Sequence, residues 1–192
     1  KEEMENEKLI WKWPDSLILE YGQLKDSSGL RKHDYGSSHP LRRRACAMSH
    51  FHLWKKAMEE DEPILILEHD AVFVEKLKPK SILKSRYDVI GLNDPRGATR
   101  MAGTFHAIVQ KEKRRFLPCP VIDRMEVPQG IAGASAYIIK PKGAKNVIKA
   151  CHEFGLWPND AILCQQLVPK IGVTKKYYTK VQGLPSTTTT NA

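Results

Sequence analysis

Two carboxylates and a histidine directly follow a short apolar run, and their position is suited to chemistry. Residues 64–67 are all apolar, and Glu68, His69 and Asp70 come next. Ligands of open α/β sheets bind beyond the carboxyl ends of strands, and carboxylate oxygens suit hard divalent cations such as Mn²⁺ or Mg²⁺. Glu68 and Asp70 are therefore predicted metal ligands. Acidic residues are also common at strand ends without a metal, so this pattern alone leaves both interpretations open.

The residues around this cluster predict the elements that must position it. Ala47, Phe51, Trp54 and Met58 recur at steps of four, three and four, which places them on one face of a helix. The run 64–67 has no polar position, which predicts a strand covered on both faces in the middle of a sheet. A helix, a turn and a buried strand indicate an α/β fold.

A second strand is predicted at residues 87–92, and it ends at Asn93 and Asp94. A helical crossover between the two strands predicts parallel pairing, so Asn93 lies at a carboxyl edge and is a candidate substrate ligand. Simple turn formation is the alternative for both residues. Residues 105–109 are expected to form another strand.

Small residues precede the next predicted strand, at residues 136–139. Gly130 and Gly133 allow a ligand to approach the backbone closely, and Ser135 lies beside them. Pro141 is expected near the first position of the following helix. Farther on, Asn159 or Asp160 is predicted to cap a short helix.

Composition indicates one globular domain with an affinity for polyanions. The chain has 192 residues, is 41% hydrophobic and 28% charged, and carries a formal net charge of +9. Its basic runs, residues 42–44 and 111–115, are not interleaved with aromatic residues as a base-stacking surface would be. We therefore expect no nucleic-acid partner, although peripheral contact with an anionic surface fits the charge.

No apolar run approaches the roughly 20 residues of a membrane span, and the charged first residues do not resemble a signal peptide. The four cysteines show no zinc-binding spacing, which is typical of reduced thiols. These features predict a cytoplasmic protein. A disordered tail is expected at residues 186–192, and nothing in the sequence indicates an oligomeric state.

The chain resembles glycosyltransferase family 25, which includes lipooligosaccharide galactosyltransferases and their collagen-modifying relatives. The residues Cys46, Ser49 and His50, followed by the strand end at 68–70, are similar to the family's Cys-x-x-Ser-His helix and its Leu-Glu-Asp-Asp strand end. Four later pieces agree in order: YDVIGL, GASAYIIKPKGAKNVI, PNDAIL and VQGLPS. The resemblance covers about residues 41–186.

This resemblance implies a single-domain GT-A-like nucleotide-diphospho-sugar transferase fold over residues 1–185, with a mostly parallel central sheet. It implies transfer of a hexose, galactose or glucose, from a UDP-sugar to a glycan or protein hydroxyl, with inversion and with Mn²⁺ or Mg²⁺ as cofactor. Asp160 becomes the candidate general base, and Asp70 and Glu68 the metal ligands. The candidate substrate-binding residues are Ser49, His50, Asn93, Ser135 and Gln182.

Three departures from the family pattern keep other hypotheses open. His69 replaces an aspartate, Ala161 replaces a glutamate, and residues 1–40 contain no recognisable opening strand for the nucleotide. A degenerate transferase fold that binds a glycan or nucleotide without turnover is therefore the alternative. The basic charge alone supports a third hypothesis, nucleic-acid binding, which predicts steeply salt-dependent affinity.

Overall fold

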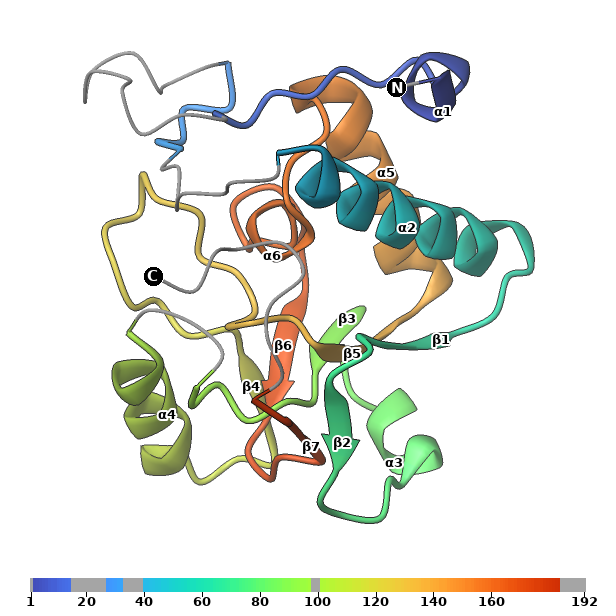
Figure 1. Ribbon diagram of the computed structural model, residues 1–192. Helices are drawn as coiled ribbons and strands as arrows, with labels where there is room; N and C mark the ends of the chain where they lie inside the picture. The colour runs from blue at the N-terminus through green and yellow to red at the C-terminus, as the bar shows by residue number, and fades with distance from the viewer. Residues whose placement is uncertain (1, 15–26, 33–39, 98–100, 184–192) are drawn as a thin grey trace.

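A five-stranded sheet lies at the centre of the molecule, with helices above and below it (Figure 1). The computed structural model describes residues 2–14, 27–32, 40–97 and 101–183. The strands stand in the order β1-β5-β3-β6-β4, and a two-stranded sheet, β2-β7, lies beside them. The strands are β1 (Ile64–Leu67), β2 (Ala71–Phe73), β3 (Val89–Gly91), β4 (Phe116–Pro118), β5 (Ala136–Ile139), β6 (Ile171–Thr174) and β7 (Thr179–Val181).

Six helices surround these strands in the described part of the chain. They are α1 (Glu2–Asn6), α2 (Pro40–Glu59), α3 (Pro79–Leu83), α4 (Ala102–Lys111), α5 (Pro141–Phe154) and α6 (Asn159–Ile162). Pro141 is at the start of α5 as predicted. The disordered tail predicted at 186–192 lies outside the described residues, and so does much of the region 1–40.

The sheet is mixed and mostly antiparallel, so the prediction of a mostly parallel sheet is wrong. β5 lies between β1 and β3 and runs antiparallel to both, β4 is antiparallel to β6, and β3 and β6 alone form a parallel pair within the central sheet. The helical crossover did fix the direction of β1 relative to β3, which run the same way. It could not reveal that a third strand is inserted between them.

β1 is an edge strand, which corrects the expectation that it is covered on both faces. The side of β1 that carries Ile66 is buried, whereas Leu65 is 36% exposed and Leu67 42% exposed. An unbroken apolar run is typical of a central strand, but it carries no information about which strands lie beside it. The outer face of β1 is left apolar and partly open to solvent.

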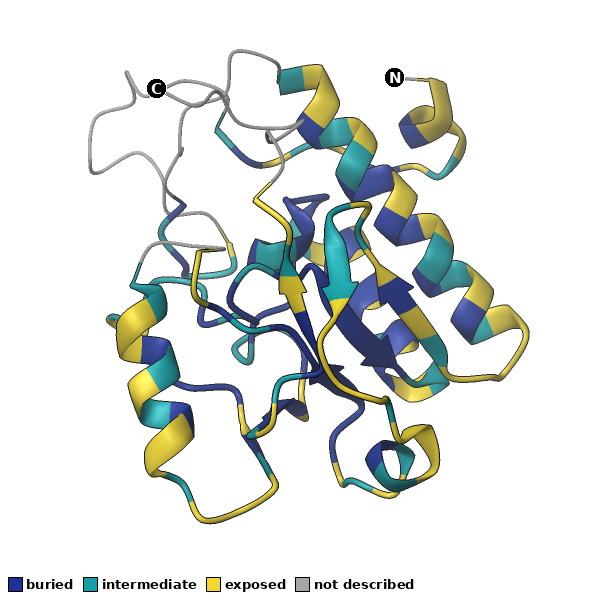
Figure 2. Cartoon of the chain, turned by 60° about the horizontal axis from the view of Figure 1, so that its bottom comes forward, coloured by how far each residue is buried: buried dark blue, intermediate teal, exposed yellow. Residues whose placement is uncertain are grey.

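The two faces of the sheet are covered differently. Helices α2 and α5 pack together over one face, where Phe51 and Trp54 of α2 join Ile66 and Tyr137 in the main core. Figure 2 shows α2 with a buried stripe toward the sheet and an exposed stripe outward, as its period predicts. The opposite face holds a smaller core that includes Ile82 of α3.

Two local predictions were also wrong. Residues 105–109 belong to α4, in which Phe105 and Val109 are four apart and both buried, so the helical period prevails over the short apolar run. Asn159 and Asp160 do not cap α6; its N-cap is Pro158, and no side chain caps it. The Asn159 side chain is engaged elsewhere.

The described residues contain no helix that is long and apolar enough to cross a membrane. All four cysteines are free thiols, as the absence of paired spacing predicted. The basic residues Arg42 to Arg44 lie in the first turns of α2.

Candidate active site

Sheet register brings three of the predicted site residues to one row. In the antiparallel pairing of β1 with β5, Leu67 lies opposite Ala136, and the next pair is Glu68 with Ser135, joined by the Glu68 N–H to the Ser135 carbonyl at 2.8 Å. Gly91 lies opposite Tyr137, and the same count places Asn93 opposite Ser135. Because directly opposed residues of an antiparallel pair project to the same face, this row gathers three side chains.

Several buried polar atoms near this row have no hydrogen-bond partner among the described residues. They are Asp70 Oδ1, Asn93 Oδ1, Ser135 Oγ and Thr179 Oγ1, and we call these four residues the open edge. Thr179 belongs to it because it bridges to Asn93. Buried polar atoms are almost always paired in native proteins, so these four are candidates for contact with a ligand.

The chemistry of the open edge favours one kind of ligand. The Asn93 amide donates to the Ala132 carbonyl at 2.8 Å and thus presents its oxygen, and Asp70 also presents a carboxylate oxygen. Ser135 and Thr179 add two hydroxyls. Acceptor oxygens and hydroxyls suit the hydroxyls of a sugar or a bound cation.

A second group of side chains lies beside the open edge and is internally paired. The Tyr137 hydroxyl lies 2.7 Å from His50 Nδ1 and receives the Trp54 indole N–H at 2.8 Å. On its other side, His50 Nε2 lies 3.5 Å from Glu68 Oε1, to which the Asn159 amide also donates at 3.2 Å. We call these five residues, Trp54, Tyr137, His50, Glu68 and Asn159, the closed network.

The Tyr137 hydroxyl lies between two nitrogens of the closed network. It accepts from the Trp54 indole N–H, and its own proton and second lone pair allow it to pair with His50 Nδ1 in either tautomer of the ring. His50 Nε2 faces the Asn159 amide nitrogen at 3.3 Å and Glu68 Oε1 at 3.5 Å. Burial, the largest cause, raises the pKa of Tyr137 well above its usual value, so its hydroxyl keeps its proton over the physiological range.

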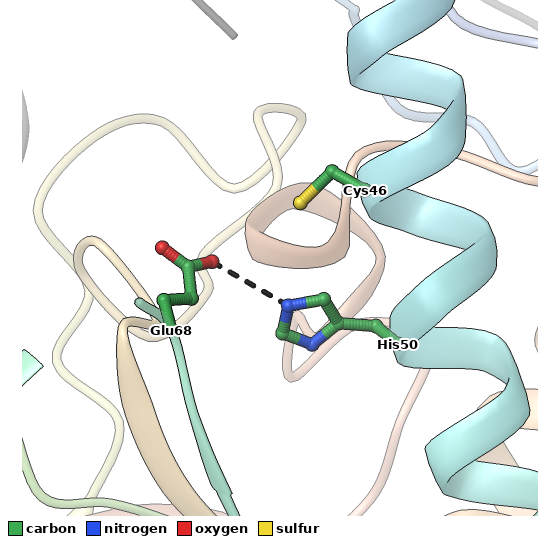
Figure 3. Close-up of side chains that lie close together, drawn as sticks. All are labelled: Cys46, His50 and Glu68. Carbon is green, nitrogen blue, oxygen red and sulfur yellow. Dashed lines mark ion pairs between the residues drawn. The ribbon is translucent and has the colours of Figure 1, made fainter. Parts of the chain in front are cut away.

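Cys46 lies one helical turn before His50 and borders the closed network. Figure 3 shows Cys46 and His50 projecting from α2 toward Glu68. The Cys46 thiol donates to Asn159 Oδ1 at 3.7 Å. Burial and then the charges of Glu68 and Asp160 raise the pKa of Cys46 to about 12, which means that Asp160 is close enough for its carboxylate to act on this thiol.

Not every predicted site residue joins this region. Ser49 is exposed, and its hydroxyl donates to the Ala45 carbonyl of its own helix. Gln182 is exposed, but its backbone N–H donates to the Asp70 carbonyl at 2.9 Å and so ties the strand β7 to the open edge. Asp160 is partly buried on α6 beside Cys46.

Tyr137, Trp54 and Asn159 were not predicted as site residues. Tyr137 is a polar side chain in an otherwise apolar strand, a signal that could have been used. The spacing of four between Cys46 and His50 also predicts that both lie on one helix face. Trp54 gave no such signal, because an indole on an apolar stripe looks the same whether or not its N–H is paired.

The fold and site are compatible with an enzyme that handles sugars, and a family comparison defines that class more closely. The family model for glycosyltransferase family 25, described as an LPS biosynthesis protein, matches residues 27–163. The chain therefore belongs to glycosyltransferase family 25. A search of curated proteins finds no match.

Proposed function

We propose that this protein transfers a hexose from a UDP-sugar to a hydroxyl of a glycan acceptor, with inversion at the anomeric carbon. Family membership supports the transferase class and its association with lipopolysaccharide biosynthesis. The observation that carries the proposal is the open edge, where Asp70, Asn93 and Ser135 offer buried polar atoms that no described residue satisfies. A GT-A type of fold stays a prediction.

The residues at this edge fit a divalent cation. Asp70 Oδ1 is buried without a partner among the described residues, which is costly for a carboxylate unless a cation or donor binds it. We propose Asp70 as the direct ligand for Mn²⁺ or Mg²⁺, with Glu68 contributing its carboxylate nearby. When bound, such an ion would neutralise charge on the departing diphosphate.

The protein's own residues would then orient the donor and remove a proton. Asn93 Oδ1 and the Ser135 hydroxyl would accept from and donate to the sugar or ribose hydroxyls. The Asp160 carboxylate would take the proton of the acceptor hydroxyl while the acceptor oxygen forms a bond to the anomeric carbon. The bond from that carbon to the diphosphate oxygen breaks, and UDP leaves with the electron pair.

The neighbourhood of Asp160 supports its assignment as the base. α6 is held close by backbone contacts: Gly130 bridges to Cys164, and a Cβ at Gly130 would meet the Asp160 and Leu163 carbonyls. Only a glycine allows this approach. The carboxylate of Asp160 is therefore carried on an element whose position is fixed against the segment that leads to the open edge.

Thermal stability with nucleotide sugars tests the proposal. A ligand that binds only the native state raises the melting temperature, so UDP-glucose or UDP-galactose with Mn²⁺ is expected to stabilise the wild-type chain. Asp70→Asn should lose this shift while keeping the melting temperature of the ligand-free protein. If no UDP-, GDP- or CMP-sugar shifts the wild type with or without Mn²⁺, the proposal is wrong.

Turnover separates the transferase from a degenerate binder. The exposed His69, where the family has an aspartate, favours binding without catalysis, because it removes one negative charge next to Asp70. Release of UDP from the stabilising donor, in the presence of a glycan acceptor, is expected for an enzyme and should fall about 100-fold or more in Asp160→Asn. Stabilisation without UDP release, even by slow hydrolysis, would support the binder instead.

A further inference from the structure

We infer that Cys46, His50 and Glu68 form a site for a thiophilic divalent cation of the Zn²⁺ class, which shares Glu68 with the metal position proposed at Asp70 but takes its other two ligands from α2. Each residue offers one ligand atom, and the three atoms, Cys46 Sγ, His50 Nε2 or Nδ1, and a Glu68 carboxylate oxygen, all lie within 4.8 Å of one another. Figure 3 shows all three side chains converging on the same space.

The helix α2 supplies two of the ligands from the same face. Cys46 and His50 are four residues apart, so their side chains lie one above the other on the same helix face. Glu68 approaches from the opposite side, directly after β1, and closes the set. Three ligands from two rigid elements therefore face one another without any loop having to move.

The distances agree with the dimensions of a zinc centre. Zn²⁺ binds sulfur at about 2.3 Å and nitrogen or oxygen at about 2.0–2.2 Å, so ligand atoms of a tetrahedral site lie roughly 3.3–3.8 Å apart. His50 Nε2 and Glu68 Oε1 are 3.5 Å apart already. The Cys46 sulfur lies within 4.8 Å of both other ligand atoms and would approach them further when an ion binds.

Neighbouring residues hold two of the ligands in place, as they do in established metal sites. The ring of His50 is fixed through Nδ1 by the Tyr137 hydroxyl at 2.7 Å, which leaves Nε2 to face Glu68. The Asn159 amide holds Glu68 Oε1 at 3.2 Å and accepts from Cys46 through its oxygen. These contacts fix the directions in which His50 Nε2 and Glu68 Oε1 point.

Electrostatics and ligand type select the cation. The carboxylates of Glu68 and Asp160 both disfavour a thiolate at Cys46, and a bound cation would reverse that by balancing the negative charges. Thiolate and imidazole ligands favour Zn²⁺ over Mn²⁺ or Mg²⁺, which prefer oxygen. The Glu68 side chain is 27% exposed, so solvent can reach the site and a water can fill a fourth position.

Cobalt substitution tests this site without reference to transferase activity. Chelator-treated protein titrated with Co²⁺ should develop the intense near-ultraviolet charge-transfer band of a cobalt–thiolate bond, and the band should saturate at one ion per chain at this site. Zn²⁺ should displace the cobalt and remove the band. Cys46→Ser is expected to abolish the band and to weaken Zn²⁺ binding by about 100-fold or more, since a direct ligand is lost.

A matched control distinguishes this site from the other thiols. Cys151 is buried on α5 and is not one of the three ligands, so Cys151→Ala should keep both the band and the Zn²⁺ affinity. The Zn²⁺-induced rise in melting temperature should likewise persist in Cys151→Ala and vanish in Cys46→Ser, with circular dichroism verifying that each variant is folded. The inference is overturned if folded wild-type protein gives no thiolate band, or if the band survives in Cys46→Ser.

Asp70→Asn separates the two metal sites. It should leave the cobalt–thiolate band unchanged, because Asp70 is not one of the three ligands. Loss of Co²⁺ binding itself in Asp70→Asn, with retention of binding in Cys46→Ser, would assign the ion to the open edge and would overturn the inference, whatever the outcome of the nucleotide-sugar experiments.

Discussion

The closed network and the open edge are neighbours in the fold, yet they differ in whether their buried polar atoms have hydrogen-bond partners. In the closed network, Trp54, Tyr137 and His50 are buried and each finds a partner. At the open edge, Asn93 and Ser135 are equally buried but keep atoms without a described partner. Because an unpaired buried polar atom costs stability, the paired atoms of the first group stabilise the native fold, whereas the unpaired atoms of the second lower its stability unless the proposed ligand binds them.

The largest effect is expected for the reactivity of Cys46, which lies next to the closed network. Burial and the nearby carboxylates raise its pKa to about 12, whereas an ordinary thiol titrates near about 8.5. At pH 8 only about one Cys46 in 10⁴ is then the reactive thiolate, and alkylation by iodoacetamide should be about 1000-fold slower than for a free cysteine.

The direction of the pH dependence follows from the raised pKa. Because Cys46 stays protonated up to about pH 12, its alkylation rate in metal-free native protein should rise tenfold per pH unit from pH 7 to 10 without a plateau. Protein unfolded in urea is the control and should level off above about pH 9. A plateau in the native protein would mean that the thiol has an ordinary pKa.

Tyr137→Phe should remove two hydrogen bonds at the centre of the closed network. Removing the hydroxyl leaves both the Trp54 indole N–H and His50 Nδ1 unpaired in the core, at a cost of about 2–4 kcal/mol in the free energy of unfolding. Urea denaturation measures this. Tyr178→Phe is the matched control: its ring is similarly buried, but its hydroxyl receives one contact, from Arg115, so the loss should stay below about 1 kcal/mol.

Ser135→Ala, at the open edge, should lower the affinity for a ligand but leave the free energy of unfolding almost unchanged. Its hydroxyl has no described partner, so removing it should change the free energy of unfolding by less than about 0.5 kcal/mol, or raise it. The affinity for the stabilising UDP-sugar should fall about tenfold, as expected for one lost hydrogen bond to a ligand. Titration calorimetry gives the affinity; a loss of 2 kcal/mol in stability would instead place Ser135 in a satisfied structural contact.

The smallest effect is expected on the outer face of β1, which belongs to neither group. Leu65 is 36% exposed on this edge strand, so Leu65→Lys should cost less than about 1 kcal/mol. Ile66→Lys on the buried side, where only 2% of the residue is exposed, is its counterpart and should prevent stable folding. Equal effects at the two positions would contradict the edge placement of β1.

The sequence predicted the elements with a strong period or a clear boundary. The apolar face of α2, the strands β1 and β5, and the start of α5 at Pro141 were all predicted correctly, because each depends on neighbours within a few residues. The short segment 105–109 was assigned to a strand because five residues do not distinguish a strand from one buried turn of helix.

The site was predicted only in part. Glu68 and Asn93 were expected at the carboxyl edge of a parallel sheet, but their meeting with Ser135 was not predicted. Ser135 joins them because β5 runs antiparallel to β1 and β3, which brings the residue before its first position to that edge. Asn159 was assigned to capping because asparagine commonly caps helices. Its actual partners, His50 and Glu68, are about a hundred residues away in sequence.

The sequence by itself determined local periodicity, the acidic strand end and the resemblance to a sugar-transferring family, since these depend on residue type and spacing alone. Only the tertiary structure decided that β5 separates β1 from β3, that Tyr137 joins Trp54 to His50, and that Cys46 meets Glu68. Such contacts depend on which surfaces pack together when the chain collapses, and that choice minimises exposed apolar area and unpaired polar atoms over the whole molecule.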